Sequence, residues 1–229
     1  MNEYRSIYHR ALGEDFERLH PRMQDRFGFS SRDGIAHVGE GTMDEVWLGR
    51  FYTLPFLLLG SWRRIMFPAS GRDVPFTISN YAYRDVFGRE TVTWLRCFHL
   101  PARTRKFDAT MIYSEKRHRI LDYLGSHQHL AVDIELGVDE HGGLRLRSGE
   151  QRFYERRVGF RFPMALSGYA DVREWWSEEE ERYRIDVAVT NPRWGPLFGY
   201  RGWFEVQEKA VGPGEIPREV LPVREERRE

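Results

Sequence analysis

The chain has 229 residues, of which 41% are hydrophobic, 14% aromatic and 31% charged, with 35 basic and 35 acidic side chains. This length and hydrophobic content are sufficient for one packed β domain with a well-solvated surface. The net charge of zero argues against non-specific nucleic-acid binding, which takes most of its affinity from a basic surface. A single cysteine, Cys97, excludes an internal disulfide and fits a reducing compartment, so we expect a cytoplasmic protein.

The N-terminal part of the chain is expected to contain short helices and one strand. Residues 4–29 carry apolar side chains at helical spacing, which Gly13 and Pro21 divide into short helices. Charges throughout the first twenty residues predict that this segment is not a signal peptide. Residues 35–49 have the pattern of a strand.

The most apolar stretch, residues 51–67, is expected to form a helix. It is apolar on nearly all sides, which predicts burial in the core. Arg50, Pro55 and Gly60 interrupt a run that is already short for a membrane span. We therefore predict a buried helix and no stable membrane insertion.

Residues 74–206 place apolar side chains at every second position of successive segments, which is the pattern of antiparallel strands with one face on a core. The segments are Val74–Ile78, Val92–Leu100, Leu130–Val138, Val158–Met164 and Tyr183–Val189. Short turns separate them and leave no room for crossover helices. We therefore expect a mainly β fold of the α+β type. It would be a strongly curved antiparallel sheet or a barrel-like clam, with N-terminal helices and the apolar helix packed on its concave face.

The domain organisation is expected to be simple. No internal repeat of fixed period is present, and residues 1–211 are predicted to form a single β-rich domain. Residues 212–229 contain three prolines and end in charged residues without periodicity. Such a composition buries little apolar surface, so we predict a disordered tail.

Two histidines at alternate positions form the strongest metal-like pattern. On a strand, His127 and His129 point the same way, and Asp133 and Glu135 lie on that same face. Imidazole and carboxylate groups serve as ligands for iron, manganese or zinc. The alternating apolar residues of this segment occupy the opposite face, so we interpret the four polar residues as a solvated strand face and predict no metal site.

Polar residues in phase with the apolar face are the better candidates for a functional site. They are Asn80, Arg96, Asp122 and Glu174. An unpaired charge that faces a core is costly, so we expect Arg96 to be buried with Glu174 or Asp122 as its acidic partner. Two interpretations remain open: a structural network, or a ligand pocket with polar anchors and aromatic walls that include Trp94 and Trp176.

Common catalytic and cofactor motifs are missing from the sequence. It has no Walker loop, dinucleotide glycine fingerprint, Gly-x-Ser-x-Gly elbow, Cys-x-x-Cys pair or His-Glu-x-x-His. Cys97 shares a strand face with His99, which is a very weak signal for a nucleophile. We therefore predict no cofactor.

Five segments, in order along the chain, carry a family resemblance. They are Ile7–Gly13 (IYHRALG), Gly39–Met43 (GEGTM), Val74–Phe76 (VPF), Gly88–Phe98 (GRETVTWLRCF) and Gly199–Phe204 (GYRGWF). Together they resemble a bacterial family known as a domain of unknown function (number 4166), over residues 6–205. Members of that family occur alone, or behind a dinucleotide-binding reductase-like domain or a membrane segment. The resemblance implies a free-standing module with a reductase-like protein as a candidate partner, and it assigns no functional residue.

Three functions are compatible with these features. The first is a binding module for a small apolar or amphipathic molecule, held by aromatic walls and oriented by Arg96 with Glu174 or Asp122. The second is an enzyme that uses the same cavity, with an inward carboxylate as acid or base. The third is an accessory domain that binds a partner and no small ligand. The first two require an open cavity lined by the inward polar residues, whereas the third requires a filled interior and an exposed apolar patch.

Overall fold

Eleven antiparallel strands follow three short helical segments in the computed structural model, which describes residues 5–49, 67–164, 167–212 and 215–229. The helical segments are α1 (Ile7–Leu12), η1 (Gly13–Arg18) and α2 (Pro21–Gly28). The strands are β1 (Ile35–Leu48), β2 (Gly71–Arg84), β3 (Glu90–His99), β4 (Thr104–Ser114), β5 (Arg119–Leu124), β6 (Leu130–Val138), β7 (Leu144–Glu155), β8 (Val158–Arg161), β9 (Tyr169–Ser177), β10 (Arg182–Asn191) and β11 (Gly195–Ala210).

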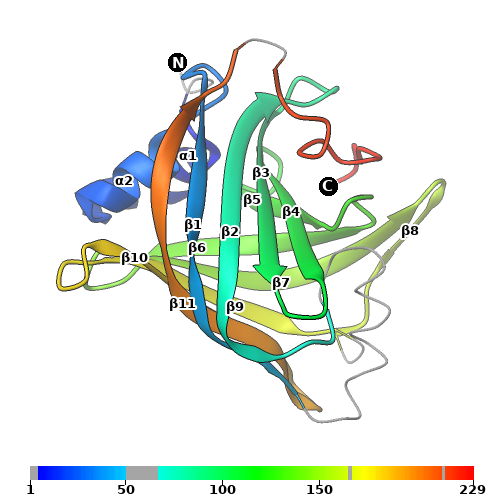
Figure 1. Ribbon diagram of the computed structural model, residues 1–229. Coiled ribbons are helices and arrows are strands. Elements are labelled where there is room, and N and C mark those ends of the chain that lie inside the picture. The colour runs from blue at the N-terminus through cyan, green and yellow to red at the C-terminus, as the bar shows by residue number, and fades with distance from the viewer. Residues whose placement is uncertain (1–4, 50–66, 165–166, 213–214) are drawn as a thin grey trace.

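The sheet closes on itself (Figure 1). Neighbouring strands pair in the order β6-β5-β4-β3-β2-β1-β11-β10-β9-β7, and β7 pairs again with β6. Ten antiparallel strands therefore form a closed barrel. Within the described chain, β8 pairs with β7 alone, and the β7–β8 hairpin projects beyond the barrel (Figure 1). The predicted mainly β, antiparallel and barrel-like fold is confirmed.

The period-two alternation of the sequence builds the core. Every second side chain of each barrel strand points inward, and these side chains join those of the helices in one cluster. Six inward aromatic rings come from β2, β3 and β11: Phe76, Trp94, Phe98, Phe198, Tyr200 and Phe204. The rings of Phe98 and Tyr200 lie 4.9 Å apart between centroids at 74°, an edge-to-face arrangement.

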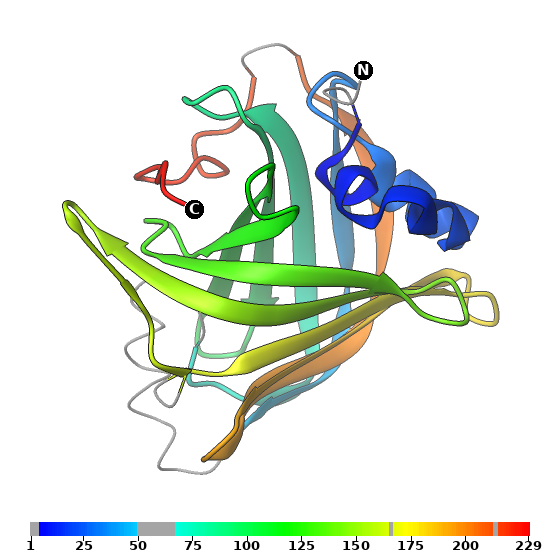
Figure 2. The same ribbon diagram turned by 180° about the vertical axis from the view of Figure 1, so that it is seen from behind.

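The N-terminal helices lie against one end of the barrel (Figure 2). The Ser6 Oγ accepts a hydrogen bond from the His9 amide and caps α1, and Pro21 occupies the first turn of α2. Helix α1 contacts β3, β4, β5 and β6, while α2 contacts β9. The three helical segments bury five apolar side chains in the core cluster: Ile7, Tyr8, Phe16, Met23 and Phe27. The predicted short helices therefore cover the barrel end.

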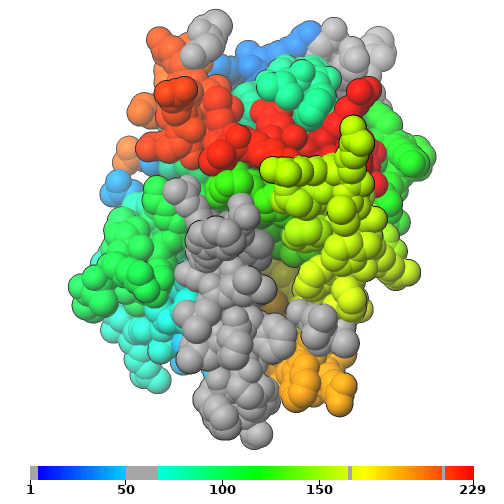
Figure 3. Space-filling model, turned by 90° about the vertical axis from the view of Figure 1, so that its right-hand side faces the viewer, coloured from blue at the N-terminus to red at the C-terminus, as the bar shows by residue number. Residues whose placement is uncertain are grey.

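The C-terminal residues 215–229 run along the outer face of the barrel (Figure 3). The Tyr123 hydroxyl donates to the Arg228 carbonyl at 2.9 Å, and the Tyr154 hydroxyl donates to the Glu229 carbonyl at 3.1 Å. This placement differs from the predicted disordered tail. The segment is held by polar contacts and by Val220, which is buried against Ala36, Tyr81 and Tyr83. Neither kind of contact requires an apolar period in the sequence.

The predicted apolar helix over residues 51–67 lies outside the described residues, apart from its last residue. Phe67 is buried, and its ring centroid lies 4.9 Å from those of both Phe98 and Phe198. The end of this segment is therefore anchored in the barrel core.

Strand β8 differs from the sequence interpretation. The alternation of Val158–Met164 predicted a strand with one face on the core, but all four residues of β8 are exposed. Val158 is 57% exposed and Phe160 is 47% exposed. Because the hairpin extends beyond the barrel, β8 has no core to cover, and its alternation does not report burial.

Candidate functional site

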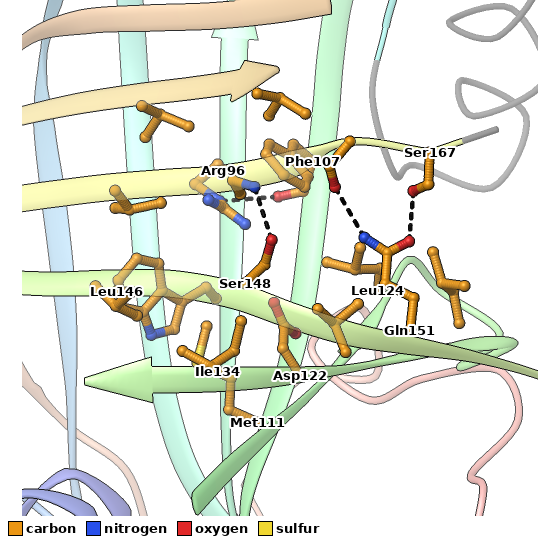
Figure 4. A pocket seen from close by; sticks show the side chains of 18 residues that line it. Arg96, Phe107, Met111, Asp122, Leu124, Ile134, Leu146, Ser148, Gln151 and Ser167 are labelled. Carbon is orange, nitrogen blue, oxygen red and sulfur yellow. Dashed lines mark hydrogen bonds between the residues drawn. The ribbon is translucent and has the colours of Figure 1, made fainter. Parts of the chain in front are cut away.

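A cavity of about 90 Å³ lies inside the barrel, between strands β3 to β7, β9 and β10 (Figure 4). Most of its wall is apolar, with Met111, Leu124, Val132, Ile134, Leu146, Val172, Val187 and Val189 among the lining side chains. The polar side chains in the wall are Arg96, Asp122, Ser148, Gln151 and Ser167. An apolar wall with a few convergent polar groups is the usual composition of a small-molecule site.

Arg96 is the buried cation of the cavity. Its alternation partners Trp94 and Phe98 predicted an inward side chain, and the residue is 4% exposed. Its Nε donates to the Phe107 carbonyl at 3.3 Å, and its Nη1 donates to the Tyr200 hydroxyl at 3.1 Å. The guanidinium carbon lies 3.8 Å from the centroid of the Phe107 ring. These contacts fix the guanidinium, while Nη2 makes no hydrogen bond to the part of the chain that the structure describes.

Asp122 is the buried carboxyl group of the same cavity. It comes from β5, which is separated from β3 in the sheet by β4, and its side chain lines the same cavity as that of Arg96 (Figure 4). Burial raises the pKa of Asp122 to about 7, although the charge of Arg96 acts in the opposite direction. Its Oδ1 is buried without a hydrogen-bond partner among the described residues. A carboxyl group with this pKa changes its charge near neutral pH.

Two further polar side chains come from β7. The Ser148 Oγ accepts from the Ala170 amide at 2.7 Å, and the Gln151 Nε2 donates to the Gly168 carbonyl at 2.8 Å (Figure 4). Sequence reasoning missed both residues. The β6–β7 register shifts between the pairs Val132–Gln151 and Ile134–Ser148, so the alternation of inward and outward side chains on β7 is interrupted between Ser148 and Gln151. A bulge of this kind cannot be located from alternation alone.

A second pair of buried charges lies outside the cavity wall. The Arg26 Nε donates to the Glu174 Oε1, and both side chains are almost fully buried, at 1% and 0% exposure. The sequence predicted Glu174 or Asp122 as the ion-pair partner of Arg96. Glu174 instead pairs with Arg26, and no ion pair between Arg96 and Asp122 is present in the described residues. The signal that sequence reasoning missed is the position of Arg26 on the buried face of α2, next to Phe27.

Trp94 connects the cavity to the helices. Its ring lines the cavity, and its Nε1 donates to the Tyr8 hydroxyl of α1 at 2.7 Å. The Tyr8 hydroxyl in turn lies 3.6 Å from the Met111 sulfur. Burial raises the pKa of Tyr8, so its hydroxyl remains neutral. The indole N–H therefore has its hydrogen-bond acceptor in α1, and Trp94 contributes an apolar ring surface to the cavity wall.

The remaining predicted site residues lie elsewhere in the barrel. Asn80 is buried on β2, opposite His37 of β1 and Trp94 of β3, and it does not line the cavity. Trp176 packs edge-on against Tyr183, with ring centroids 5.0 Å apart, and is also absent from the cavity wall. Of the six predicted residues, the structure brings together Arg96, Asp122 and Trp94 at the cavity.

The strand face that carries the histidine pattern is solvated only in part, because Glu135 is exposed whereas His129 and Asp133 are not. His129 and Asp133 are buried, at 8% and 5% exposure, although the sequence predicted an exposed position for both. The imidazole of His129 contacts the Tyr154 carbonyl, and Asp133 forms ion pairs with Arg117 and Arg152. Arg224 of the C-terminal segment also contacts His129, which explains the burial. The described residues hold no cluster of three or more His, Cys, Asp or Glu side chains suited to a metal ion.

The described helices contain no segment long and apolar enough to span a membrane.

Comparisons with known proteins place the chain among uncharacterised relatives. The family model "Domain of unknown function (DUF4166)" matches residues 19–204. The chain is 33% identical over 204 residues to "Uncharacterized protein YndH" of Bacillus subtilis (strain 168), a match that covers 89% of this chain and 98% of that protein. Among solved structures, a trans-AT PKS dehydratase domain from Brevibacillus brevis aligns over 81% of this chain and 78% of its own, with 10% identity and a TM-score of 0.21.

Proposed function

This chain belongs to the family described as Domain of unknown function (DUF4166), and we propose that it is a binding module that holds a small apolar or amphipathic molecule inside its barrel. One observation carries the proposal: an apolar cavity is lined by both a buried cation, Arg96, and a buried carboxyl group, Asp122. An accessory domain without a small ligand would have a filled interior.

The hydrogen bonding of the cavity supports this function over a purely structural network. An unpaired polar atom in a core is costly, and the buried Arg26–Glu174 pair also leaves Arg26 Nη1, Arg26 Nη2 and Glu174 Oε2 without partners among the described residues. Asp122 and Arg96 differ from that pair because both side chains line the cavity. Asp122 Oδ1 has no partner in the described part of the chain, and Arg96 keeps Nη2 uncommitted there. A ligand with one polar group and an apolar body would bond to these polar atoms and fill the apolar part of the cavity.

An NMR titration with butan-1-ol tests the proposal. A cavity of roughly 150 Å³ in another protein binds benzene, so about 90 Å³ suits a probe of this small size. We expect shifts of backbone amide signals concentrated on the residues that line the cavity. Shifts spread over the outer surface would contradict the proposal.

A matched pair of variants provides the control. Val132→Phe places a ring in the cavity and should abolish binding, whereas Val158→Phe makes the same change on the exposed β8. Overpacking costs about 1–3 kcal/mol, so Tm is measured for both variants. Binding that persists in a folded Val132→Phe protein would place the ligand elsewhere.

A second candidate function is acid–base catalysis in the same cavity. The pKa of Asp122, raised to about 7 by burial, matches that of a general acid or base at neutral pH. In deuterium oxide, an enzyme of this kind would exchange a carbon-bound hydrogen of a bound ligand. Asp122→Asn would abolish that exchange and retain binding, whereas a binding module shows no exchange in either protein.

We propose a cytoplasmic location on the separate ground of cysteine content. The single cysteine, Cys97, supports a reducing compartment such as the cytoplasm.

A further inference from the structure

We propose that the cavity binds a small apolar monocarboxylate, whose carboxylate pairs with Arg96 while a protonated Asp122 donates a hydrogen bond to it. This inference rests on the proposed function, because it assigns a ligand class to the same cavity. Binding then includes the uptake of one proton from solvent by Asp122 whenever that group is ionised in the free protein.

The charge balance of the barrel interior carries the first step. Arg26 and Glu174 pair with one another, which leaves Arg96 and Asp122 as the charged groups among the described residues that line the cavity. A guanidinium stays charged at ordinary pH, and a buried charge needs a counter-charge. When Asp122 is protonated, Arg96 is a buried cation with only neutral hydrogen-bond partners, Phe107 and Tyr200. An anionic group is the ligand that balances it.

The geometry of Arg96 carries the second step. Its Nε and Nη1 are held by the Phe107 carbonyl and the Tyr200 hydroxyl, and its guanidinium lies over the Phe107 ring. The orientation of the group is therefore fixed before a ligand arrives, and the remaining nitrogen, Nη2, is left for it. Guanidinium groups bind carboxylates in short, charge-assisted hydrogen bonds.

The surroundings of Asp122 carry the third step. In the described chain, the charged and titratable groups that act on this part of the interior are Arg96 of β3, Tyr8 of α1, Arg26 of α2, Glu174 of β9 and Tyr200 of β11. Two carboxyl groups in one buried site share a proton, because both cannot be ionised there. A ligand carboxylate on Arg96 therefore favours the protonated form of Asp122, whose O–H can donate to the ligand.

The same electrostatics disfavour the opposite ligand class, an ammonium ion. An ammonium group would have to lie in a low-dielectric cavity with the Arg96 cation, and like charges in such a site repel strongly. An alcohol can accept from Arg96 or donate to Asp122, but it does not compensate the charge of either. A carboxylate is therefore expected to bind more tightly than an alcohol or an amine with the same carbon chain.

Calorimetric titration with butanoate, butan-1-ol and butan-1-amine tests this order. Butanoate should bind most tightly at pH 6, and its affinity should fall about tenfold per pH unit above pH 7, as expected for uptake of one proton. Titrations in buffers of different ionisation enthalpy measure that proton directly. The uptake should approach one at pH 8 and should be small at pH 6.

Two variants separate the two anchors. Asp122→Asn imitates the neutral acid, so butanoate should bind without proton uptake and with little dependence on pH. Arg96→Gln should weaken butanoate binding at least tenfold at pH 6 while binding of butan-1-ol is retained. Matched controls on exposed side chains, Asp171→Asn and Arg201→Gln, should behave like the unmodified protein. If Arg96→Gln does not fold, the proton uptake and the Asp122→Asn variant still test the proposal.

The outcomes distinguish this inference from the proposed function. Tightest binding of butanoate, with proton uptake that Asp122→Asn removes, supports both. Binding of butan-1-ol or butan-1-amine as tight as that of butanoate overturns the carboxylate assignment and leaves the binding module standing. Butanoate binding without pH dependence overturns the role of Asp122. Binding of none of the three probes contradicts the proposed function itself.

Discussion

At the scale of single residues, the two buried carboxyl groups Glu174 and Asp122 differ in whether an arginine is hydrogen-bonded to them. Burial raises the pKa of Glu174, and the hydrogen bond and charge of Arg26 oppose that effect. Burial also raises the pKa of Asp122, but its nearest cation, Arg96, forms its hydrogen bonds with other groups. Glu174 therefore has a fixed partner, whereas Asp122 remains available to a ligand.

Arg26→Met is expected to lower the free energy of unfolding by about 3–5 kcal/mol at neutral pH, because it leaves Glu174 buried without its cation. The double variant Arg26→Met/Glu174→Leu should recover most of this loss. Urea denaturation measures the free energy of unfolding of both variants. The control Arg201→Met breaks an exposed pair with Glu45 and should cost about 0–1 kcal/mol. A similar cost for Arg26→Met and the control would show that the buried pair is not required.

Alternation predicted the inward direction of single residues but not their partners. The positions of Arg96, Asp122 and Trp94 in phase with apolar neighbours predicted that they face the interior, where they line one cavity. The pairing of Glu174 with Arg26 depends on how α2 lies against the barrel, which no strand pattern contains. Gln151 lies beyond a register shift in β7, so its phase could not be read from the sequence.

At the scale of elements, the C-terminal segment is held by a network of charges on the outer face. The Glu226 side chain receives hydrogen bonds from Arg224 and Arg228, and its backbone carbonyl accepts from Arg89. The Glu226 amide donates to the Gln128 side chain at 2.6 Å. Because these contacts are polar and irregular, the sequence predicted disorder where the structure has a docked segment.

Acid pH is expected to release this segment. Burial opposes the ionisation of Glu226, but hydrogen bonds and charges from Arg228 and Arg224 outweigh it and lower the pKa of Glu226. The ionised form holds the Arg224 and Arg228 side chains, which in turn contact His129 and the backbone carbonyls of Tyr154 and Val158. It thereby stabilises docking at neutral pH, and that contribution is lost as the pH falls below the ordinary range of a glutamate. NMR signals of residues 215–229 should move to positions typical of disordered chain below about pH 4.

A variant reproduces this release at neutral pH. Glu226→Gln removes the charge that Arg224 and Arg228 contact, and should cost about 1–3 kcal/mol of docking free energy. Trypsin should then cleave within the segment more rapidly than in the unmodified protein. Glu219→Gln, on an exposed side chain of the same segment, should leave the cleavage rate unchanged. Equal rates for the two variants would contradict a role for Glu226 in docking.

At the scale of the whole molecule, closure is the property that the sequence could not supply. Alternation and short turns predicted antiparallel strands and a curved sheet, because both are local patterns. Closure requires β6 to pair with β7 along most of its length, and β1 to pair with β11 although the two are far apart in sequence. These pairings depend on the order and tilt of strands, which local patterns do not fix.

Hydrogen exchange should reveal this closure directly. A closed barrel has no free strand edge, so backbone amides of β1 to β7 and β9 to β11 are paired on both sides over much of their length. Among the described strands, β8 has one neighbour, β7, and its four residues, Val158–Arg161, are exposed. Amides of β8 should therefore exchange by local opening, at least about a hundredfold faster than those of β10 and β11, which should open only with the whole barrel. Equal protection of β8 and β10 would mean that the hairpin is covered in solution, and rapid exchange along β6 would mean that the barrel opens at the β6–β7 pairing.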